Sequence, residues 1–268
     1  MVRITGGQNP LVKEIRALKN KSGREETGLF FIEGVRFVTE ALQEKASIRY
    51  LMVSETFSTD AASMELLQSV NDGADCYRVP DSLFASISDT QTPQGILAVL
   101  DLKRRQLENA VLSGGLLVLL DGIKDPGNMG TIIRTADAAG CEGIVVPAGC
   151  VDIYNPKVLR STMGSVFHVP VYHCEDMKSA INIARRNGYK IRVSHLDGAV
   201  SIYEADLTGP AALVIGSEAE GVGDEIVKAA DMLLKIPMPG RAESLNASVA
   251  AGIMIFETTR QKYLKEAR

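Results

Sequence analysis

The chain has 268 residues, of which 46% are hydrophobic and 23% charged, so it can bury one large core or two smaller ones. Its formal net charge of -4 argues against a protein that coats nucleic acid nonspecifically, because that mode depends on neutralising many phosphates, and any RNA binding must use a local basic patch. No apolar run reaches the roughly 18 residues of a membrane span, and the N-terminus lacks a signal-peptide core, so we expect a cytoplasmic protein with no membrane partner.

Strands and helices alternate over the first hundred residues, which predicts a small α/β domain at residues 1–101. The apolar pattern predicts helices at Asn9–Lys21, Glu33–Leu42, Ala61–Val70 and Ser82–Ile87, and strands at Leu29–Ile32, Ile48–Val53, Cys76–Val79 and Gly95–Leu100. Basic residues gather on and just after the first of these helices. They are either a solvated helix face or phosphate contacts for RNA: Lys13, Arg16, Lys19, Lys21 and Arg24.

The apolar pattern lapses at residues 102–115, where we place a linker, and it resumes as a second α/β pattern over residues 116–268. Leu116–Leu120 is wholly apolar, as expected of a parallel strand buried on both faces. The further strands predicted are Gly143–Val146, Val166–Val171, Tyr189–Val193, Ala212–Ile215 and Met232–Ile236. The helices predicted are Met129–Ala139, Asn155–Met163, Ala180–Asn187, Asp224–Ala230 and a long last helix that starts at Ser244.

Three stretches of this second half stand out. Asp125-Pro-Gly-Asn128 is a turn before a helix that carries Arg134, and Asn128 is placed to cap that helix. The loop 216–223 connects a strand to a helix, which is where open α/β sheets bind ligands. A Pro-Gly loop then precedes the last helix, with Ser244 and Asn246 at the helix threshold. Each stretch taken alone fits an ordinary structural connection.

Taken together, the three stretches resemble the signature motifs of the SpoU family of RNA ribose 2'-O-methyltransferases, in the SPOUT superfamily. Residues 125–140, with the sequence Asp-Pro-Gly-Asn-Met-Gly-Thr-Ile-Ile-Arg, are similar to the first motif, residues 213–222 to the second and residues 236–252 to the third. Residues 9–36 also resemble the N-terminal substrate-binding domain of many SpoU enzymes, a ribosomal-protein-like α/β fold that binds RNA. The resemblance implies a parallel-sheet SPOUT domain with a C-terminal trefoil knot.

The resemblance also implies a chemistry. The protein would transfer a methyl group from S-adenosyl-L-methionine to a ribose 2'-hydroxyl in RNA, with 23S ribosomal RNA the preferred substrate, and would act as a homodimer joined through its C-terminal domain. The residues that the resemblance implies for catalysis are Asn128, Arg134, Glu218, Ser244 and Asn246. Those that it implies for the methyl donor are Gly216, Ile236, Met238, Ser244 and Leu245.

Other functions fit the sequence less well. Transfer RNA stays open as the substrate, and a fold-sharing RNA-binding factor without catalysis is a second reading. A dinucleotide-dependent oxidoreductase is disfavoured because no G-x-G-x-x-G opens a βα unit. The four cysteines form no CxxC pair, and His168, His173 and Cys174 lack further ligands, so we expect no metal. The stretch Ser194–Asp197 holds triad residue types, but near neighbours along one segment rarely converge as a triad.

Overall fold

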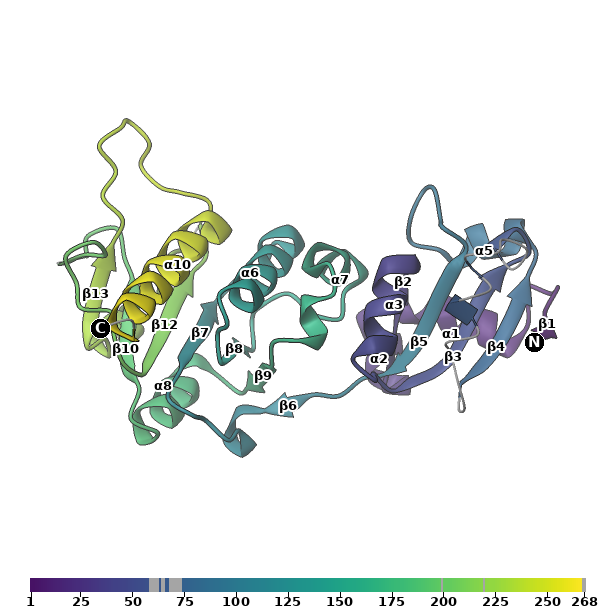
Figure 1. Ribbon diagram of the computed structural model, residues 1–268, viewed down its shortest axis with the longest axis horizontal. Helices are drawn as coiled ribbons and strands as arrows, with labels where there is room; N and C mark the ends of the chain where they lie inside the picture. The colour runs from purple at the N-terminus through teal and green to yellow at the C-terminus, as the bar shows by residue number, and fades with distance from the viewer. Residues whose placement is uncertain (58–62, 64–65, 68–73, 199, 219, 267–268) are drawn as a thin grey trace. The chain divides into compact units, whose positions relative to one another are not determined.

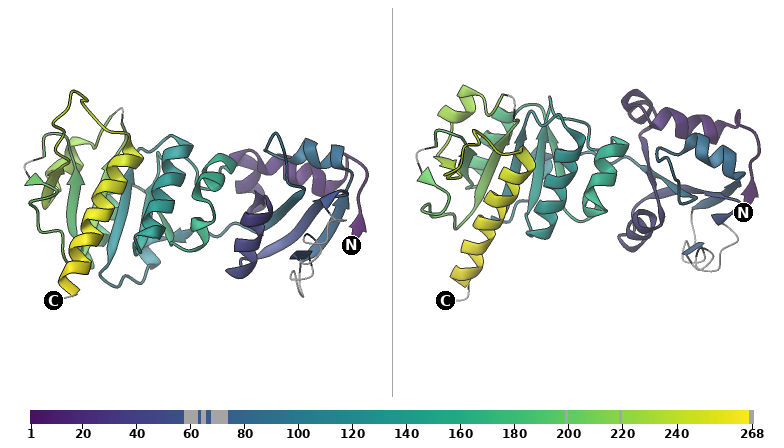
Figure 2. Two further views of the ribbon diagram at one scale, coloured as in Figure 1. Left: turned by 45° about the horizontal axis from the view of Figure 1, so that its top comes forward. Right: turned by 90° about the horizontal axis from the view of Figure 1, so that it is seen from above.

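The computed structural model describes residues 1–57, 63, 66–67, 74–198, 200–218 and 220–266. They form two compact units, drawn in Figures 1 and 2. The N-terminal unit comprises Met1–Lys103 and Tyr154–Phe167, and the C-terminal unit comprises Arg104–Ile153 and His168–Arg268. A segment from the middle of the chain thus completes the N-terminal unit, which the division at residues 101 and 115 did not foresee.

The N-terminal unit is a mixed sheet with helices packed on it. Its described strands are β1 (Val2–Arg3), β2 (Leu29–Glu33), β3 (Ile48–Ser54), β4 (Asp75–Val79) and β5 (Ile96–Asp101), in the order β1-β4-β3-β5-β2. Its described helices are α1 (Pro10–Leu18), α2 (Lys21–Thr27), α3 (Val35–Gln43), α5 (Asp81–Ile87), α7 (Pro156–Thr162) and the 3-10 turn η3 (Ser165–Phe167). The predicted helix Ala61–Val70 lies largely outside the described residues.

A buried apolar cluster and contacts from Tyr154 hold this unit together. On one face of the sheet, Ile15 of α1 and Phe84 of α5 join a buried cluster with Met52 of β3. The mid-chain segment is held by aromatic contacts, since the ring centroids of Tyr154 and Phe30 are 4.8 Å apart. The hydroxyl of Tyr154 also donates a 2.7 Å hydrogen bond to a backbone carbonyl near the end of the first segment.

The C-terminal unit is a parallel sheet covered by helices. Its described strands are β6 (Arg105–Gln106), β7 (Leu116–Asp121), β8 (Gly143–Pro147), β9 (Val171–Cys174), β10 (Lys190–Ser194), β11 (Val200–Ser201), β12 (Ala211–Gly216) and β13 (Met232–Lys235). Their order is β11-β13-β10-β12-β7-β8-β9-β6, and each of these neighbouring pairs is parallel. The described helices are η2 (Leu107–Asn109), α6 (Pro126–Ala138), α8 (Met177–Arg186), α9 (Asp224–Lys228) and α10 (Ala247–Glu266). The prediction of a parallel α/β sheet is confirmed.

Helices α6 and α10 lie side by side (Figure 1). A Cβ placed on Gly252 of α10 would stand 3.8 Å from the methyl group of Thr135 on α6, so the small residues of α10 permit this close approach. On the strand side, Leu117, Val118, Leu119 and Leu120 of β7 are fully buried, as expected of a central parallel strand.

Three helices start with the same device. Asn9, Asp125 and Asn155 each precede a proline and accept a backbone hydrogen bond through a side-chain oxygen, which caps α1, α6 and α7. Proline suits the first helical position because its missing N–H has no intrahelical partner there. The pattern corrects one prediction, since Asp125 and not Asn128 caps α6.

Two element boundaries also differ from prediction. The expected strand Val166–Val171 is instead the 3-10 turn η3 followed by β9, which starts at Val171. Pro170 has no N–H to give to a sheet, and pairing with β8 begins at the next residue. The last helix starts at Ala247 rather than at Ser244, because Asn246 is the residue whose side chain accepts from the first helical amides.

A carboxylate anchors the stretch before β7. Glu142 accepts hydrogen bonds from the backbone and hydroxyl of Ser113, from the backbone of Gly115 at 2.7 Å and from the hydroxyl of Tyr189. Burial raises the pKa of Glu142, but these hydrogen bonds lower it more, and its net pKa falls below the ordinary range. Burial and the bond to Glu142 raise the pKa of Tyr189 to about 12.

Candidate active site

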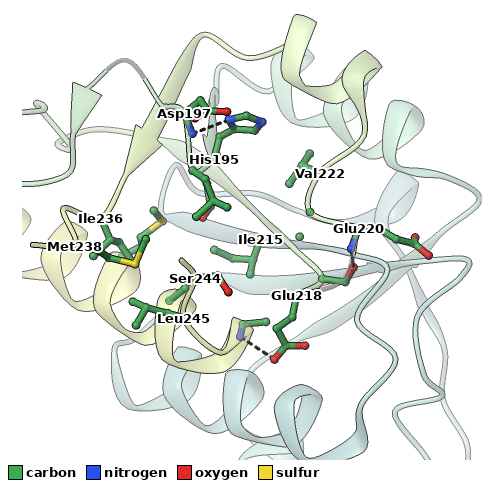
Figure 3. A pocket seen from close by; sticks show the side chains of 18 residues that line it. His195, Asp197, Ile215, Glu218, Glu220, Val222, Ile236, Met238, Ser244 and Leu245 are labelled. Carbon is green, nitrogen blue, oxygen red and sulfur yellow. Dashed lines mark hydrogen bonds between the residues drawn. The ribbon is translucent and has the colours of Figure 1, made fainter. Parts of the chain in front are cut away.

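A cavity of about 370 Å³ opens at the carboxyl ends of β10, β12 and β13 (Figure 3). These strands are neighbours in the sheet although other elements separate them in sequence, so the loops that follow them meet at one edge. Helix α10 closes one side with Ala247, Ala250 and Met254. The volume falls within the range of small-molecule sites.

All five residues predicted to bind the methyl donor line this cavity: Gly216, Ile236, Met238, Ser244 and Leu245. Gly216 ends β12, where a Cβ would stand only 2.3 Å from the carbonyl oxygen of Gly221, so no other residue fits without moving the loop. The predicted donor-binding residues thus supply apolar side chains, one hydroxyl and a closely packed glycine to the lining.

Glu218 is the centre of a hydrogen-bond network at the edge of the cavity. Its Oε1 accepts from Asn128 Nδ2 at 2.8 Å, from Asn246 Nδ2 at 2.8 Å and from the backbone N–H of Ala247 at 3.0 Å. Asn246 Nδ2 also donates to Asn128 Oδ1 at 2.9 Å. The network therefore brings together one residue from each of the three motifs.

The helix caps leave the side-chain NH2 groups of Asn128 and Asn246 available to donate to Glu218. Asp125 Oδ1 accepts from the backbone N–H of Asn128 at 2.8 Å, so the side chain of Asn128 has no capping role and turns to Glu218. Asn246 uses its oxygen to cap α10, where it accepts from the backbone of Ser248 at 3.0 Å, and its amide nitrogen to reach Glu218. Ser244 lines the cavity without joining this network within the described residues.

Arg134 lies apart from this network. It is exposed, and within the described residues no ion pair or hydrogen bond holds its guanidinium. Arg134 follows Asn128 by six residues on α6, which places it roughly 9 Å along the axis and about 120° around it. It does not line the cavity of its own chain.

The cavity is acidic. Asp197, Glu218 and Glu220 line it, whereas the described lining residues include no lysine or arginine. Glu220 reaches outward to Lys124, whose Nζ lies 3.3 Å from its Oε1. Below the same loop, burial raises the pKa of Asp121, at the end of β7. Such a lining suits a cationic ligand, and a sulfonium is a cation.

The stretch Ser194–Asp197 is part of this site, which sequence reasoning missed. The sequence offers it only as a catalytic triad, whereas the structure shows that it begins at the last residue of β10 and lines the cavity. The available signal was its position, since it directly follows an apolar strand of the parallel sheet.

The predicted RNA contacts divide into two groups. Lys13, Arg16 and Lys21 are exposed, although Arg16 donates to the carbonyl of Gly7 at 3.0 Å and Lys21 pairs with Glu25 at 3.8 Å. Lys19 is half-buried and donates to a backbone carbonyl at 2.6 Å.

Arg24 is a correction to this set of contacts. Its side chain is buried, with 2% of the residue exposed, and its guanidinium donates to the carbonyl of Leu18 at 2.7 Å. A buried side chain held in this way cannot contact a phosphate, so Arg24 stabilises the join between α1 and α2.

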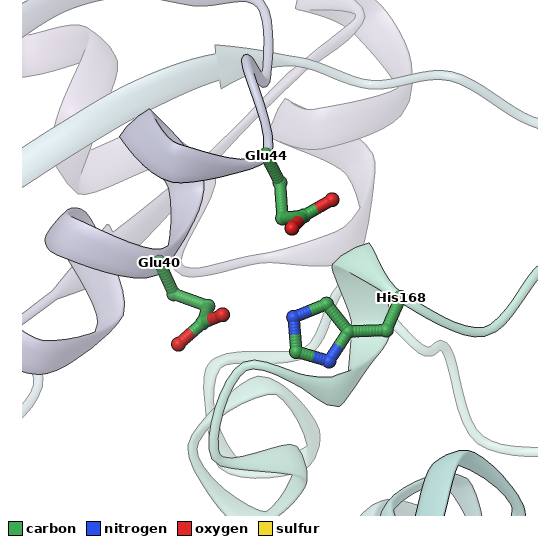
Figure 4. Close-up of side chains that lie close together, drawn as sticks. All are labelled: Glu40, Glu44 and His168. Atoms are coloured by element: carbon green, nitrogen blue, oxygen red, sulfur yellow. The ribbon is translucent and has the colours of Figure 1, made fainter.

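Figure 4 draws Glu40, Glu44 and His168. Glu40 and Glu44 are one turn apart at the end of α3 in the N-terminal unit, whereas His168 belongs to the C-terminal unit. His168 Nδ1 already lies 3.0 Å from an oxygen of Asp137.

The parallel sheet and the acidic cavity at its carboxyl edge fit a methyltransferase with a cationic donor. Comparisons with known proteins agree: residues 115–256 match the SpoU rRNA Methylase family and residues 9–98 match the MRM3-like substrate binding domain. The chain belongs to the SpoU rRNA methylase family, as predicted.

Relatives cover nearly the whole chain. The 23S rRNA (guanosine(2553)-2'-O)-methyltransferase RlmP of Bacillus subtilis is 33% identical over 96% of this chain and 98% of its own length. The crystal structure of the AdoMet-bound rRNA methyltransferase from Sinorhizobium meliloti is 34% identical with a TM-score of 0.87, over 96% of this chain and 97% of that one. The SpoU methyltransferase AviRb from Streptomyces viridochromogenes, in complex with the cofactor AdoMet, is 28% identical with a TM-score of 0.87, over 95% and 98%.

These comparisons confirm the predicted enzyme class and S-adenosylmethionine as the predicted cofactor. Within the described part of the chain, no helix is both long and apolar enough to cross a membrane.

Proposed function

We propose that this protein methylates a ribose 2'-hydroxyl of ribosomal RNA, with 23S ribosomal RNA as the substrate. The observation that carries the proposal is the network around Glu218, which joins the three motifs at the edge of an acidic cavity. The named substrate rests on the relatives, since RlmP of Bacillus subtilis is a 23S rRNA methyltransferase and is similar to this chain from end to end.

The residues present fit S-adenosylmethionine, which supplies an electrophilic sulfonium methyl group when bound. Ile236, Met238 and Leu245 offer apolar surface for an aromatic base. Asn128, Glu218 and Asn246 fix one another by hydrogen bonds, so they hold a preorganised polar edge where a ribose can be oriented.

Arg134 is proposed to act on the attacking oxygen. An alcohol must lose its proton as it attacks, and a guanidinium stabilises the developing alkoxide through charge and a planar pair of donors. Arginine is a poor base because its guanidinium stays protonated in proteins, so stabilisation rather than proton removal is its role here.

Transfer of labelled methyl groups tests this function. The protein should label 23S ribosomal RNA taken from cells that lack this enzyme, and Arg134→Ala should lose roughly 10²- to 10³-fold in kcat while donor affinity stays unchanged. Transfer RNA from the same cells is the control substrate. Labelling of transfer RNA alone would move the function to that substrate. No labelling of any RNA would favour a non-catalytic RNA-binding factor.

The N-terminal unit is proposed to recognise the RNA. Its match to an MRM3-like substrate binding domain supports this division of labour, and the exposed Lys13, Arg16 and Lys21 offer cations for phosphates. Arg24 is not among these contacts because its side chain is buried.

The protein is proposed to be a homodimer joined through the C-terminal unit. Val249, Phe256 and Tyr263 stand seven residues apart on α10, and they are 49%, 50% and 69% exposed. Two turns of helix separate successive members, so they form one apolar stripe that a second copy can cover. We propose that a two-fold axis at this stripe places Arg134 of one protomer near the cavity of the other.

A C-terminal trefoil knot and a cytoplasmic location belong to the same proposal. The knot is supported by the family, and the sheet order is compatible with it because β13 pairs with β10 and β11 rather than with its sequence neighbour β12.

A further inference from the structure

The turn after β10 presents two polar side chains to the cavity, at the side away from Glu218 in Figure 3. They belong to His195 and Asp197, with Leu196 between them 62% exposed. No motif of the sequence includes this turn, and it is not part of the network around Glu218.

The turn is held firmly against the neighbouring strand. The backbone N–H of His195 donates to the carbonyl of Leu234 at 2.9 Å, and the N–H of Gly198 donates to the carbonyl of His195 at 3.1 Å. A Cβ on Gly198 would stand 2.7 Å from the backbone of Leu234, so the turn cannot relax around a larger residue. His195 and Asp197 are therefore presented on a fixed backbone.

A hydrogen bond within the turn determines which nitrogen of the His195 ring can donate. The backbone N–H of Asp197 donates to Nδ1 of His195 at 3.2 Å, so Nδ1 is an acceptor and the proton of the neutral ring sits on Nε2. Neither Nε2 of His195 nor the carboxylate of Asp197 has a partner within the described residues. One fixed donor and one free carboxylate are thus held side by side.

We infer that His195 and Asp197 bind the two ribose hydroxyls of the methyl donor. This rests on the proposal that the cavity holds S-adenosylmethionine. Vicinal hydroxyls both donate and accept hydrogen bonds, so one can accept from Nε2–H while the other donates to the carboxylate, and a carboxylate that accepts from ribose hydroxyls is also the solution used in dinucleotide folds.

The amino-acid end of the donor is a zwitterion, so its charge does not decide whether it lies in this corner. Its ammonium group would be attracted by the carboxylate of Asp197, whereas its carboxylate would be repelled. Ser244 also lines the cavity and offers an uncharged hydroxyl for that end of the donor.

Isothermal titration of the full-length protein with two ligands tests the inference. S-adenosylhomocysteine carries adenosine and the amino acid, whereas 5'-methylthioadenosine carries only the adenosine part. Asp197→Asn and His195→Ala should each weaken both ligands by the same factor, roughly ten-fold or more, because each removes a hydrogen bond to the shared ribose. Glu204→Gln, which removes an exposed carboxylate of the same unit outside the cavity, is the control.

A second series of titrations removes a ribose hydroxyl from the ligand instead of a side chain from the protein. The 2'-deoxy form of 5'-methylthioadenosine should bind the unmodified protein at least ten-fold more weakly than the parent, and this loss should shrink in Asp197→Asn. The comparison of the two ligands in the unmodified protein needs no variant to fold, and a melting curve of Asp197→Asn accompanies its titration.

The outcomes separate the two proposals. Failure of the unmodified protein to bind S-adenosylhomocysteine would contradict the donor site itself. Binding that the variants leave unchanged would overturn only the role of His195 and Asp197. Loss of S-adenosylhomocysteine with full retention of 5'-methylthioadenosine would overturn it too, because the corner would then hold the amino-acid end.

Discussion

Mixing two inactive variants tests whether Arg134 serves the cavity of its own chain or that of a partner. Arg134→Ala keeps the cavity and the Glu218 network intact, and Glu218→Ala keeps Arg134 intact. In a homodimer with composite sites, a mixed dimer has one site with both residues present and one site with neither. Random exchange makes half of the dimers mixed, so about a quarter of all sites should be restored.

The position of Arg134 on α6 is our reason to expect the trans arrangement in the proposed homodimer. Asn128 points to Glu218 at 2.8 Å, whereas Arg134 lies on another face of the same helix, about 120° away, and does not line the cavity. Removal of the Glu218 carboxylate leaves three N–H groups without this acceptor. At an exposed site, water can replace it, so we expect a stability cost of only about 1.5 kcal/mol.

The assay is methyl transfer to ribosomal RNA after the two variants are mixed, mildly denatured and allowed to re-pair. Each variant alone should fall at least 10²-fold below the unmodified enzyme, and the mixture should reach about a quarter of its activity. Melting curves check that both variants are folded. If the mixture stays as inactive as its components while mixed dimers are demonstrably present, then Arg134 acts in cis or does not act at all.

Four further predictions concern the surfaces and the core. Exchange of Lys13 and Lys21 for glutamine should weaken RNA binding and flatten the slope of log affinity against log salt by about 2, as measured by filter binding at several salt concentrations. Arg24→Ala should instead destabilise the N-terminal unit by about 1–3 kcal/mol in urea melts, because it empties a buried hydrogen-bonded position, and a Lys13→Ala control should not. Phe256→Glu should shift the protein to a monomer in sedimentation and abolish methyl transfer, and an unchanged dimer would exclude this stripe as the interface. Since the pKa of Glu142 is lowered by folding, its stabilisation is complete above about pH 4.3 and is lost as the pH falls through its folded pKa, so Glu142→Gln should flatten the acid branch of the stability curve.

The fold of the C-terminal unit could largely be predicted from the sequence. Uniformly apolar runs such as Leu116–Leu120 are typical of parallel strands, and they lie where expected. The prediction of a strand at Val166–Val171 was wrong. It followed the apolar pattern and did not take account of Pro170, which has no N–H to donate to β8. The membership of residues 154–167 in the N-terminal unit rests on aromatic contacts to residues more than a hundred positions away, which local patterns do not encode.

The residues of the site could also be predicted in part, because local motifs identify some of them but not their hydrogen-bond partners. The motifs supplied the predicted donor-binding residues, all of which line the cavity. The hydrogen bonds of Glu218, however, come from residues of two other motifs that are distant in the sequence. The cap of α6 could have been identified correctly from Asp125-Pro126, because the same pattern starts α1 and α7. The approach of His195 to the cavity depends on the placement of β10 between β12 and β13, which the order of elements along the chain does not reveal.

The negative and positive charges of the proposed site have different effects, the first on donor binding and the second on the rate of methyl transfer. Asp197, Glu218 and Glu220 favour a cationic donor, but positive charge on the donor declines as its methyl group leaves. These carboxylates therefore stabilise the bound ground state more than the transition state, and they contribute affinity rather than rate. Acceleration must then come from groups that act on the accepting oxygen, where negative charge develops. The Asn128–Glu218–Asn246 network can orient the ribose, and of the residues proposed for catalysis only Arg134 carries the positive charge that the developing alkoxide requires. An arginine placed beside these carboxylates would pair with them. Its position on another face of α6 keeps that charge available, in the proposed homodimer, for the site of a second protomer that has bound RNA.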